Sequence, residues 1–256
     1  MSPRTPVVAG RRAVAEAIES GRVVEVLVAA GAKPTQGLRT VLDGARRAGL
    51  PVLERSRNEL DALAPDHRGV VATLARPVTP LSERELATHA FDDEAIVVVL
   101  DGVEDPQNLG AAARSCEAAG VAMLVTRTHR AAGVTPAALR ASAGALLHLP
   151  QARVANISRA LDRLRDAGFT SVGLEGSAPT TIEDEPCPDG RVALVAGSEG
   201  KGLSRLVRER CDLLVALPMR GRVGSLNVSA SLAAALYAYV LPSRGSRPSG
   251  RGRDWG

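Results

Sequence analysis

Three short polar segments carry the residue types that could bind a ligand and act on it. They span residues 105–110 with Arg114 beyond them, residues 197–203, and residues 224–229. Each follows an apolar run typical of a strand, and each precedes or enters a helical pattern. Because ligands bind beyond the carboxyl ends of strands in an α/β sheet, the three segments predict one shared site.

The glycine-rich run after the apolar residues 193–196 has the backbone freedom of a ligand loop. Its glycines, at positions 197, 200 and 202, allow a tight turn and a close approach to a ligand. A P-loop needs Ser or Thr after Gly-Lys, but Gly202 follows Lys201. The glycine spacing also differs from the G-x-G-x-x-G dinucleotide pattern. The run therefore matches neither phosphate motif, and an ordinary glycine-rich turn is the alternative.

Taken together, the three segments resemble the signature motifs of the SpoU (TrmH-like) branch of the SPOUT methyltransferases. Their order and spacing over about 120 residues both fit. That branch transfers a methyl group from S-adenosylmethionine to a ribose 2′-hydroxyl of RNA, so the resemblance implies this activity and this cofactor. The residues that carry the three motifs in turn are Asn108, Gly110 and Arg114; Gly197, Glu199, Gly200 and Gly202; and Leu217, Pro218 and Met219 followed by residues 225–229.

The resemblance implies catalytic roles for Arg114, Asn108, Glu199, Asn227 and Ser229. An arginine is almost never deprotonated, so Arg114 is expected to position phosphate and hydroxyl, with general-base work the weaker hypothesis. Glu199 would orient Arg114 or the substrate ribose. Asn108 would fix its loop or contact RNA, and an Asx turn is the structural alternative. Asn227 and Ser229 open the last predicted helix, where both residue types cap well, and Ser229 would also position substrate.

A second group of residues is implied to bind the cofactor, largely through backbone groups. Apolar walls with main-chain donors and acceptors suit an adenine. Plain core packing is the alternative for the leucines, and for Lys201, which would meet RNA phosphate, the alternative is a solvated loop lysine. The implied cofactor-binding residues are Leu174, Gly176, Gly197, Gly202, Leu217 and Leu226.

The first part of the chain reads as a small α/β unit over residues 8–76. Residues 10–14 and 67–72 resemble landmarks of the N-terminal RNA-binding domain of many SpoU enzymes, which is similar to a kink-turn-binding ribosomal-protein fold. The resemblance implies that Arg11 and Arg12 bind RNA. A solvated helix face is the alternative for this pair.

The remaining elements alternate between strand and helix, which predicts an α/β fold with a parallel sheet covered on both faces. A trefoil knot in this C-terminal domain is implied only by the resemblance. We expect an N-terminal RNA-binding domain over 1–76, a linker over 77–93, a methyltransferase domain over 94–242 and a disordered basic tail over 243–256. Periodicity predicts helices over 11–18, 38–48, 59–63, 111–119, 135–147, 157–167 and 227–240, strands over 23–29, 51–53, 95–100, 121–125, 170–174, 192–196 and 213–217, a strand after residue 69, and a loop over 101–109.

Composition excludes several other classes of protein. The chain has 256 residues, of which 45% are apolar, and we find no run of the ~18 apolar residues that a membrane span needs and no signal peptide. Cys116, Cys187 and Cys211 are scattered, which indicates a reducing cytoplasm and no disulfide framework. The four histidines do not cluster either, so we expect no metal.

The positive charge is concentrated at the two ends of the chain. Residues 1–76 hold 12 Arg and Lys against 8 Asp and Glu, residues 77–242 hold 16 against 19, and residues 243–256 hold 4 against 1. RNA affinity rests largely on phosphate neutralisation, so the ends are the expected RNA-backbone contacts, although a basic chain need not bind RNA. Aromatic residues are 2% of the chain, which argues against base-stacking modules.

These observations predict a cytoplasmic, homodimeric RNA 2′-O-ribose methyltransferase with its active site at the subunit interface, as the family resemblance implies. Within the family, the two-domain layout is most similar to enzymes that methylate a guanosine of bacterial 23S rRNA, so the expected partner is 23S rRNA or a ribosome assembly intermediate. A tRNA enzyme and an antibiotic-resistance rRNA enzyme remain alternatives. A non-catalytic RNA-binding relative is disfavoured because Asn108, Arg114, Glu199 and Asn227 are retained. A dehydrogenase would need G-x-G-x-x-G after an early strand, which the sequence lacks.

Overall fold

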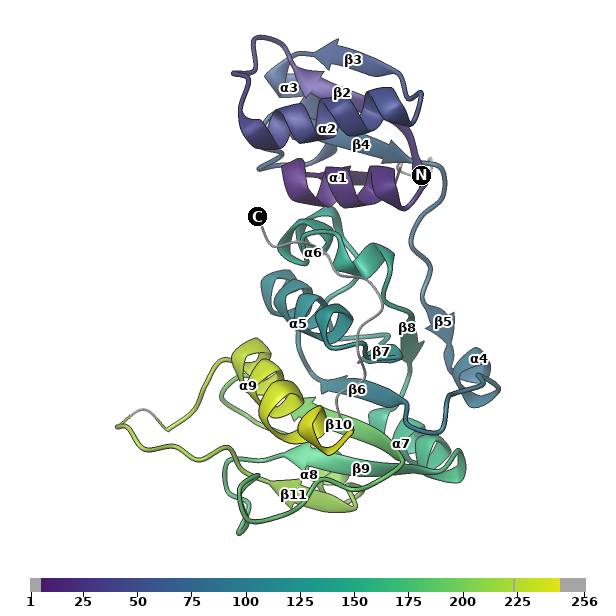
Figure 1. Cartoon of the computed structure of the whole chain (residues 1–256). Coiled ribbons are helices and arrows are strands. Elements are labelled where there is room, and N and C mark those ends of the chain that lie inside the picture. Colours follow the sequence, from purple (N-terminus) through teal and green to yellow (C-terminus); the bar gives the residue numbers. More distant parts are fainter. Residues whose placement is uncertain (1–5, 223, 245–256) are drawn as a thin grey trace.

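The computed structural model describes residues 6–222 and 224–244, which form two β-sheets (Figure 1). The smaller sheet has the order β1-β4-β2-β3. Strand β4 runs antiparallel to both neighbours, whereas β2 and β3 are parallel, so this sheet is mixed. Its strands are β1 (Val7–Ala9), β2 (Val23–Ala29), β3 (Val52–Arg55) and β4 (Val70–Leu74).

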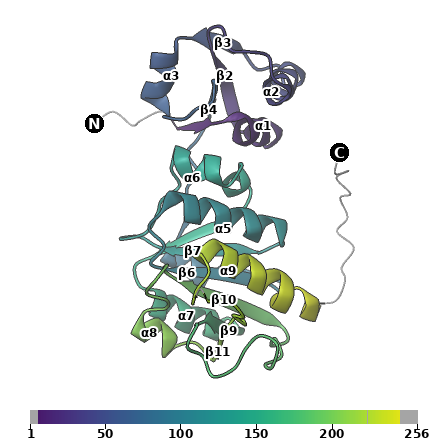
Figure 2. The same ribbon diagram turned by 90° about the vertical axis from the view of Figure 1, so that its left-hand side faces the viewer.

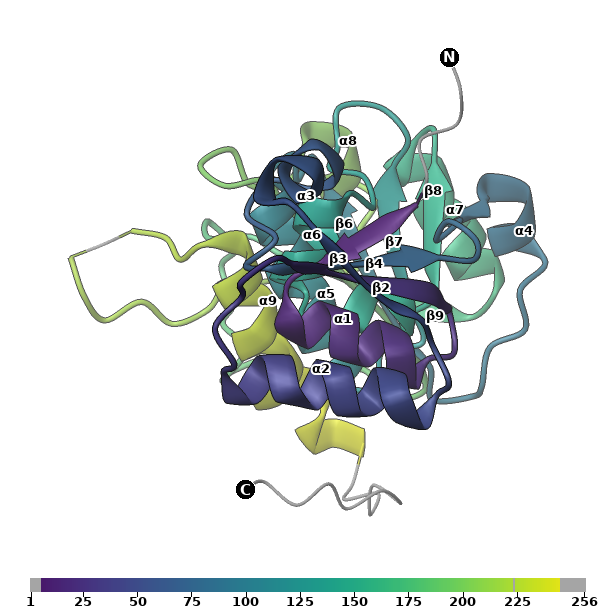
Figure 3. The same ribbon diagram turned by 90° about the horizontal axis from the view of Figure 1, so that it is seen from above.

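Three helices cover the small sheet, two on one face and one on the other. Helices α1 (Arg11–Glu19) and α2 (Gln36–Arg47) lie side by side, and α3 (Arg57–Leu63) lies across the sheet from them (Figure 3). Successive residues of β2 separate the two layers: Val26 packs with α1 and α2, whereas Leu27 packs with α3. The alternation of side chains along a strand therefore supplies a core on each face.

The larger sheet has seven strands in the order β11-β9-β10-β6-β7-β8-β5, and every neighbouring pair is parallel. This confirms the predicted α/β class and parallel sheet; the knot stays a prediction. The sequence analysis did not anticipate β5 and β8. The strands are β5 (Leu81–Ser82), β6 (Ile96–Asp101), β7 (Met123–Arg127), β8 (Gln151–Val154), β9 (Phe169–Leu174), β10 (Arg191–Gly197) and β11 (Leu213–Val215).

Helices cover both faces of this sheet, as predicted. Strand β6 is buried throughout, and its residues alternate between the two layers: Val98 packs in the cluster that includes α5 and α9, and Val99 in the cluster that includes α7 and α8. Helix α9 continues as a π-helical turn over Leu236–Val240 and a short 3-10 turn over Pro242–Arg244. The helices are α4 (Glu83–Ala87), α5 (Pro106–Ala118), α6 (Pro136–Ala141), α7 (Ile157–Asp166), α8 (Arg205–Arg208) and α9 (Val228–Ala235).

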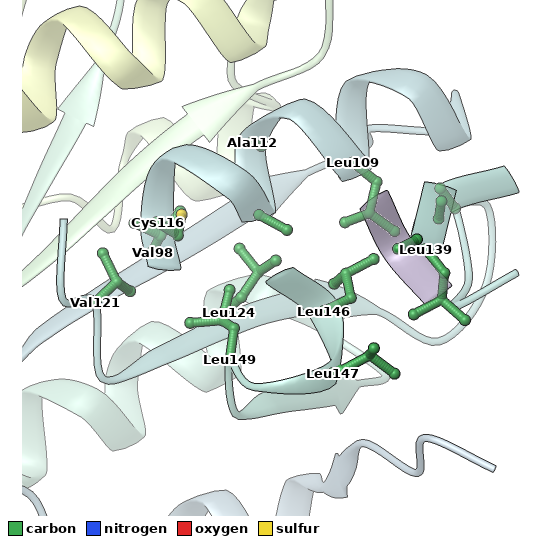
Figure 4. Packing of buried hydrophobic residues seen from close by; sticks show 14 of the residues in the cluster. Val98, Leu109, Ala112, Cys116, Val121, Leu124, Leu139, Leu146, Leu147 and Leu149 are labelled. Atoms are coloured by element: carbon green, nitrogen blue, oxygen red, sulfur yellow. The ribbon is translucent and has the colours of Figure 1, made fainter. Parts of the chain in front are cut away.

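Helix α5 is held to the sheet by one apolar stripe. Leu109, Ala112 and Cys116 recur every three to four residues and lie over Val98 and Leu124 of the strands (Figure 4). Burying a leucine side chain of this kind stabilises the fold by about 1.5–3 kcal/mol. The stripe fixes the rotation of α5 and therefore leaves its polar side chains on the opposite, exposed side.

The start of α5 corrects a sequence prediction. The loop expected over 101–109 ends early, because Asp105 caps the helix by accepting a hydrogen bond from the Gln107 backbone N–H (2.9 Å). Pro106 occupies the first helical position, where its missing N–H costs nothing. Asn108 therefore stands on the first turn of a helix and not in a loop.

The helix predicted over 135–147 is broken. Helix α6 ends at Ala141, and Ala143 and Gly144 then have φ of 52° and 96°, before a 3-10 turn over Ala145–Leu147. The break lets α1 come close, because a Cβ on Gly144 would lie 2.5 Å from the Cβ of Glu16. Packing between the two domains therefore overrides the local helical pattern.

Residues 77–93, predicted as a linker, contain regular structure of the larger domain. Strand β5 pairs with β8, and the Glu83 carboxylate accepts a hydrogen bond from Arg159 Nε on α7 (2.6 Å). The stretch between the two sheets that lies outside helix and strand is thus short, and the predicted domain boundaries stay predictions. Of the predicted disordered tail, residues beyond 244 lie outside the described part of the chain.

The two domains pack directly against each other through α6, which lies between the small sheet and α5 (Figures 1 and 2). Arg140 donates a hydrogen bond to the Pro65 carbonyl (3.0 Å) and lies 3.5 Å from the Asp66 carboxylate. On the other side of the contact, His148 Nε2 lies 3.5 Å from a carboxylate oxygen of Glu16. One apolar cluster runs across the junction, so the domains share part of their core.

Candidate active site

The loops that follow β6, β9, β10 and β11 meet at one edge of the larger sheet. These four strands are consecutive neighbours and parallel, so their carboxyl ends lie together. Asp101, at the end of β6, is buried and accepts a hydrogen bond from the Ser204 backbone N–H (2.8 Å). This bond ties the end of β6 to the residue that follows the glycine-rich segment, a role that the sequence analysis did not find.

The glycine-rich segment folds back on itself as a closed loop. The Ser198 N–H donates to the Gly202 carbonyl (3.1 Å), and the Gly202 N–H donates to the Ser198 carbonyl (2.9 Å). A Cβ on Gly197 would lie 2.0 Å from the carbonyl carbon of Gly202, so only glycine fits there. The loop therefore presents Glu199 and Lys201 at its tip.

A cavity of about 280 Å³ lies beside this loop. All six residues predicted to bind the cofactor line it: Leu174, Gly176, Gly197, Gly202, Leu217 and Leu226. Cofactor binding by these residues stays a prediction, but the fold brings them together from four separate segments. The sequence analysis did not assign other lining residues to the cofactor, including Glu175, Ser231 and the motif residue Met219. Of these, Glu175 could have been found from its position directly after a strand.

The chemistry of this cavity fits S-adenosylmethionine. Leucine side chains give it apolar walls, and the glycine loop exposes main-chain groups, which together suit a purine. Glu175, Glu199 and Lys201 line the same space, and the excess of one acidic residue would favour a cationic ligand. Leu226 is 44% exposed, so the cavity opens towards solvent.

Four of the predicted catalytic residues form one hydrogen-bonded network. Asn227 Nδ2 donates to Asn108 Oδ1 (2.8 Å), and Asn108 Nδ2 donates to Glu199 Oε2 (3.4 Å). Asn227 Oδ1 accepts from the backbone N–H (2.9 Å) and hydroxyl (2.6 Å) of Ser229. The network joins all three polar segments, and it leaves the second Glu199 oxygen for another donor.

This network borders a second cavity of about 280 Å³, lined by Asn108, Glu199 and Lys201 among others. The two cavities share Ser198, Glu199, Lys201 and Val228 and are therefore adjacent. A ligand in the first cavity and a substrate in the second would both touch the tip of the glycine loop.

Arg114 lies apart from this network. In the described part of the chain no hydrogen bond or ion pair joins it to Glu199, so the expected orientation of Arg114 by Glu199 is not present within one chain. Six residues separate Arg114 from Asn108, which is about 9 Å along a helix. Arg114 instead lines a third cavity, of about 560 Å³, together with Arg11 and Arg12, the predicted RNA-binding pair.

Burial disfavours the thiolate form of all three cysteines by raising the pKa of their thiols. Cys116 lies on the buried face of α5, and burial raises the pKa of its thiol far above the usual range. Burial also raises the pKa of Cys211 to about 12, with the nearby Asp212 and Asp101 adding to the effect. Over residues 6–222 and 224–244, no group of three or more His, Cys, Asp and Glu side chains could hold a metal ion. Within the same ranges, no helix is both long and apolar enough to cross a membrane.

Comparison with known families gives two matches that together cover most of the chain. The pattern of the SpoU rRNA Methylase family matches residues 95–237. The pattern described as RNA 2′-O ribose methyltransferase substrate binding matches residues 7–80. The first match takes in the larger sheet from β6 onward and all three polar segments, and the second takes in the small sheet.

Individual proteins match over nearly the full length. YacO of Bacillus subtilis, assigned to the TrmH family of tRNA/rRNA methyltransferases, is 38% identical over 245 residues, 94% of this chain and 96% of its own. The 23S rRNA (guanosine-2′-O-)-methyltransferase RlmB of Coxiella burnetii is 38% identical over 231 residues, 89% and 91% of the two chains. The SpoU methyltransferase AviRb of Streptomyces viridochromogenes, crystallised with its cofactor AdoMet, is 28% identical with a TM-score of 0.72, over 93% of this chain and 90% of its own.

Proposed function

The chain belongs to the SpoU family of S-adenosylmethionine-dependent RNA 2′-O-ribose methyltransferases, and from this premise we propose that its substrate is a guanosine ribose of 23S rRNA. The observation that supports this choice of substrate is the similarity to the Coxiella burnetii enzyme over both domains. The Bacillus subtilis relative is equally similar and has a tRNA/rRNA name, so tRNA is the alternative.

We assign the cofactor to the cavity beside the glycine loop. Bound there, S-adenosylmethionine supplies an electrophilic methyl group on a sulfonium. Leu174, Leu217 and Leu226 would hold its adenine between apolar walls, while the backbone of the glycine loop would contact its polar edges. The loop's closure on itself fixes these groups before the cofactor arrives, which reduces the ordering cost of binding.

The ribose hydroxyl is assigned to the second cavity, against Glu199. The carboxylate of Glu199 would accept the hydroxyl hydrogen bond and turn the oxygen lone pair towards the methyl donor. Asn108 and Asn227 hold this carboxylate through Oε2, so its orientation is set without substrate. The Ser229 hydroxyl in turn donates to Asn227 Oδ1, and Asn227, which is the N-cap of α9, serves both structure and site.

Arg114 is assigned to a phosphate of the RNA. It is exposed and has no acidic partner in the described part of the chain, so its charge is available to an anion. An arginine side chain is suited to positioning an anion and is a poor base.

A homodimer is part of this proposal. Tyr237, beside α9, is 52% exposed, and Leu226 and Met219 near the cofactor cavity are 44% and 41% exposed. A second copy of the chain would cover these exposed side chains. We expect Tyr237→Asp to convert the dimer to a monomer in sedimentation velocity. Val24→Asp, at a 49% exposed valine of the small sheet, is the matched control.

The substrate test is tritium transfer from labelled S-adenosylmethionine to unmodified 23S rRNA, 16S rRNA and bulk tRNA in parallel. Label in 23S rRNA alone, followed by mapping to a guanosine ribose, is the expected result. Label in tRNA alone would keep the chemistry and contradict the substrate. Label in none of the RNAs, with the cofactor bound, would require an assembly intermediate in place of free rRNA.

A further inference from the structure

The third cavity, between the two domains, is lined by five arginines. These are Arg11, Arg12 and Arg68 of the small domain and Arg114 and Arg140 of the large one. The other lining residues are Gly10, Ala13, Gly37, Gln107, Ala141 and Ala143, so none of the eleven described lining residues is acidic. We call this cavity the arginine cleft.

Most of this positive charge is uncompensated within the described part of the chain. Arg12, Arg68 and Arg114 are exposed and form no ion pair there, and Arg11 forms none either. The Nε of Arg11 is buried and has no hydrogen-bond partner. Only Arg140 has an acidic partner, Asp66, at 3.5 Å. Like charges gathered in this way repel each other, and an anion in the cleft would remove that repulsion.

The backbone around the cleft is shaped to hold these side chains in place. A Cβ on Gly37 would lie 3.2 Å from the Cδ of Arg11, and a Cβ on Gly10 would lie 3.2 Å from the Cγ of Arg140. Arg68 and Ala143 both have left-handed backbone, with φ of 53° and 52°. Strained residues of this kind tend to cluster at binding sites, where the surrounding structure maintains them.

The first turn of α1 opens onto the same cleft and adds to its positive potential. The N-cap is Gly10, which has no side chain to cap the helix, and no acidic residue stands in the first turn. Arg11 and Arg12 occupy that turn, although positive side chains are unfavourable at the positive end of a helix dipole. A bound anion would accept hydrogen bonds from the free backbone N–H groups and offset this repulsion.

We propose that the arginine cleft binds consecutive phosphodiester groups of the RNA strand that leads to the reacting ribose. The bound strand would then run from the small domain to α5. The proposal rests on the proposed function only in taking RNA as the ligand. Arg68 and Arg140 are new members of the RNA-binding surface. Arg140 has a double task, since it also holds the domains together through Pro65 and Asp66.

The test compares two charge-matched double variants of the full-length protein, Arg12→Gln with Arg68→Gln and Arg57→Gln with Arg84→Gln. The control arginines lie on α3 and α4, are exposed, and form no side-chain hydrogen bond or ion pair within the described residues. Binding of a fluorescein-labelled 12-nucleotide single-stranded RNA is followed by anisotropy over a series of salt concentrations, without cofactor. S-adenosylmethionine binding by calorimetry and the melting temperature report on the integrity of each variant.

We expect the cleft variant to bind the RNA about tenfold more weakly and to lower the salt slope of log K by about 1.4, since each lost phosphate contact on a single strand removes about 0.7. The control variant should stay within about twofold of wild type. Equal losses in both variants would mean that only net charge matters and would overturn the proposal. Unchanged RNA affinity with altered sedimentation would assign the cleft to a subunit contact and also overturn it.

This assay separates the cleft from the proposed function. The wild type could have a steeper salt slope than the cleft variant and yet methylate no rRNA or tRNA. That result would contradict the substrate proposal and still support the proposal for the cleft. If the wild type and the cleft variant methylate 23S rRNA equally and bind RNA with equal affinity, the substrate proposal would be supported and the proposal for the cleft contradicted.

Discussion

The edge of the large sheet and the junction between the domains both depend on glycines, but they are built to hold different things. At the sheet edge, Gly197 lets a loop close on itself and leaves a cavity walled by leucines and main chain. At the junction, Gly144 lets two domains touch, and the cavity that remains is walled by arginines. We propose a small ligand for the cavity at the sheet edge and a polymer for the one at the junction.

The contrast teaches how the two kinds of ligand are recognised. A small cofactor is selected by shape and by a few fixed hydrogen-bonding groups, so its site must be rigid and local. A nucleic-acid backbone is held by many charges, each of modest effect, so its site can be assembled from distant elements. The following substitutions damage one region and test whether the other survives.

The largest expected effect is that of Gly197→Ala on the cofactor cavity. The new Cβ would lie 2.0 Å from the Gly202 carbonyl carbon, so the loop must move and its main-chain groups with it. We expect S-adenosylmethionine affinity measured by calorimetry to fall by about 1,000-fold, or about 4 kcal/mol. Gly221→Ala is the control, since nothing lies within 4 Å of its Cβ. Cofactor binding that survives Gly197→Ala would place the cofactor elsewhere.

Gly144→Ala should damage the junction and spare the cofactor cavity. Its Cβ would clash with Glu16 at 2.5 Å, and its φ of 96° is strained for alanine. We expect the free energy of unfolding in urea to fall by about 3 kcal/mol.

Gly120→Ala separates strain from clash, because Gly120 has a φ of 71° but nothing within 4 Å of its Cβ. We expect Gly120→Ala to lower the free energy of unfolding by only about 1 kcal/mol. Equal costs for the two variants would mean that the domains do not depend on this contact.

Arg114→Gln should separate RNA handling from cofactor binding. Arg114 lines the arginine cleft and not the cofactor cavity, so calorimetry should give an unchanged S-adenosylmethionine affinity. We expect turnover in the tritium assay to fall about 30-fold, because the ribose would lose its alignment. Near wild-type turnover would remove Arg114 from the mechanism.

The smallest expected effect is at Glu83, the first residue of α4 in the larger domain. Hydrogen bonding from Arg159, helped by the Ala155 backbone N–H and the charge of Arg163, lowers the pKa of Glu83 below its ordinary 4.5. A carboxyl group whose pKa is lowered by folding stabilises the folded state. This stabilisation is complete when the pH is above the ordinary pKa, and it is lost as the pH falls through the lowered pKa. Glu83→Gln should therefore cost about 1 kcal/mol at pH 7 and progressively less below about pH 4.5. A difference that does not shrink in acid would contradict the ion pair.

The cofactor side of the molecule could be predicted from sequence because its residues follow strands and lie in compact motifs. Leu174, for example, is the last residue of strand β9, Gly176 follows two positions later, and both line the cavity. The arginine cleft could not be predicted as a unit. Arg68 and Arg140 are 72 residues apart in the sequence, and no local pattern shows that they share a cavity.

The errors in the fold have local physical causes. The start of α5 was missed although Asp105 and Pro106 form a capping signal, because the apolar pattern becomes regular only later. The break at Gly144 depends on Glu16, far away in sequence, and no helical period reveals it. Strand β5 has two residues and β8 has four, which is too few for a reliable alternation.

Because of the strand order of the large sheet, its cavity beside the glycine loop can form only after the small sheet during synthesis. The small sheet has all its strands once Leu74 has been made, whereas β10 must enter between β9 and β6, and α9 follows later still. At about 5–20 residues per second, the ribosome adds Ala235, the end of α9, roughly 10–30 s after Leu74. A growing chain thus has every strand of its small domain well before the walls of the cavity beside the glycine loop are complete.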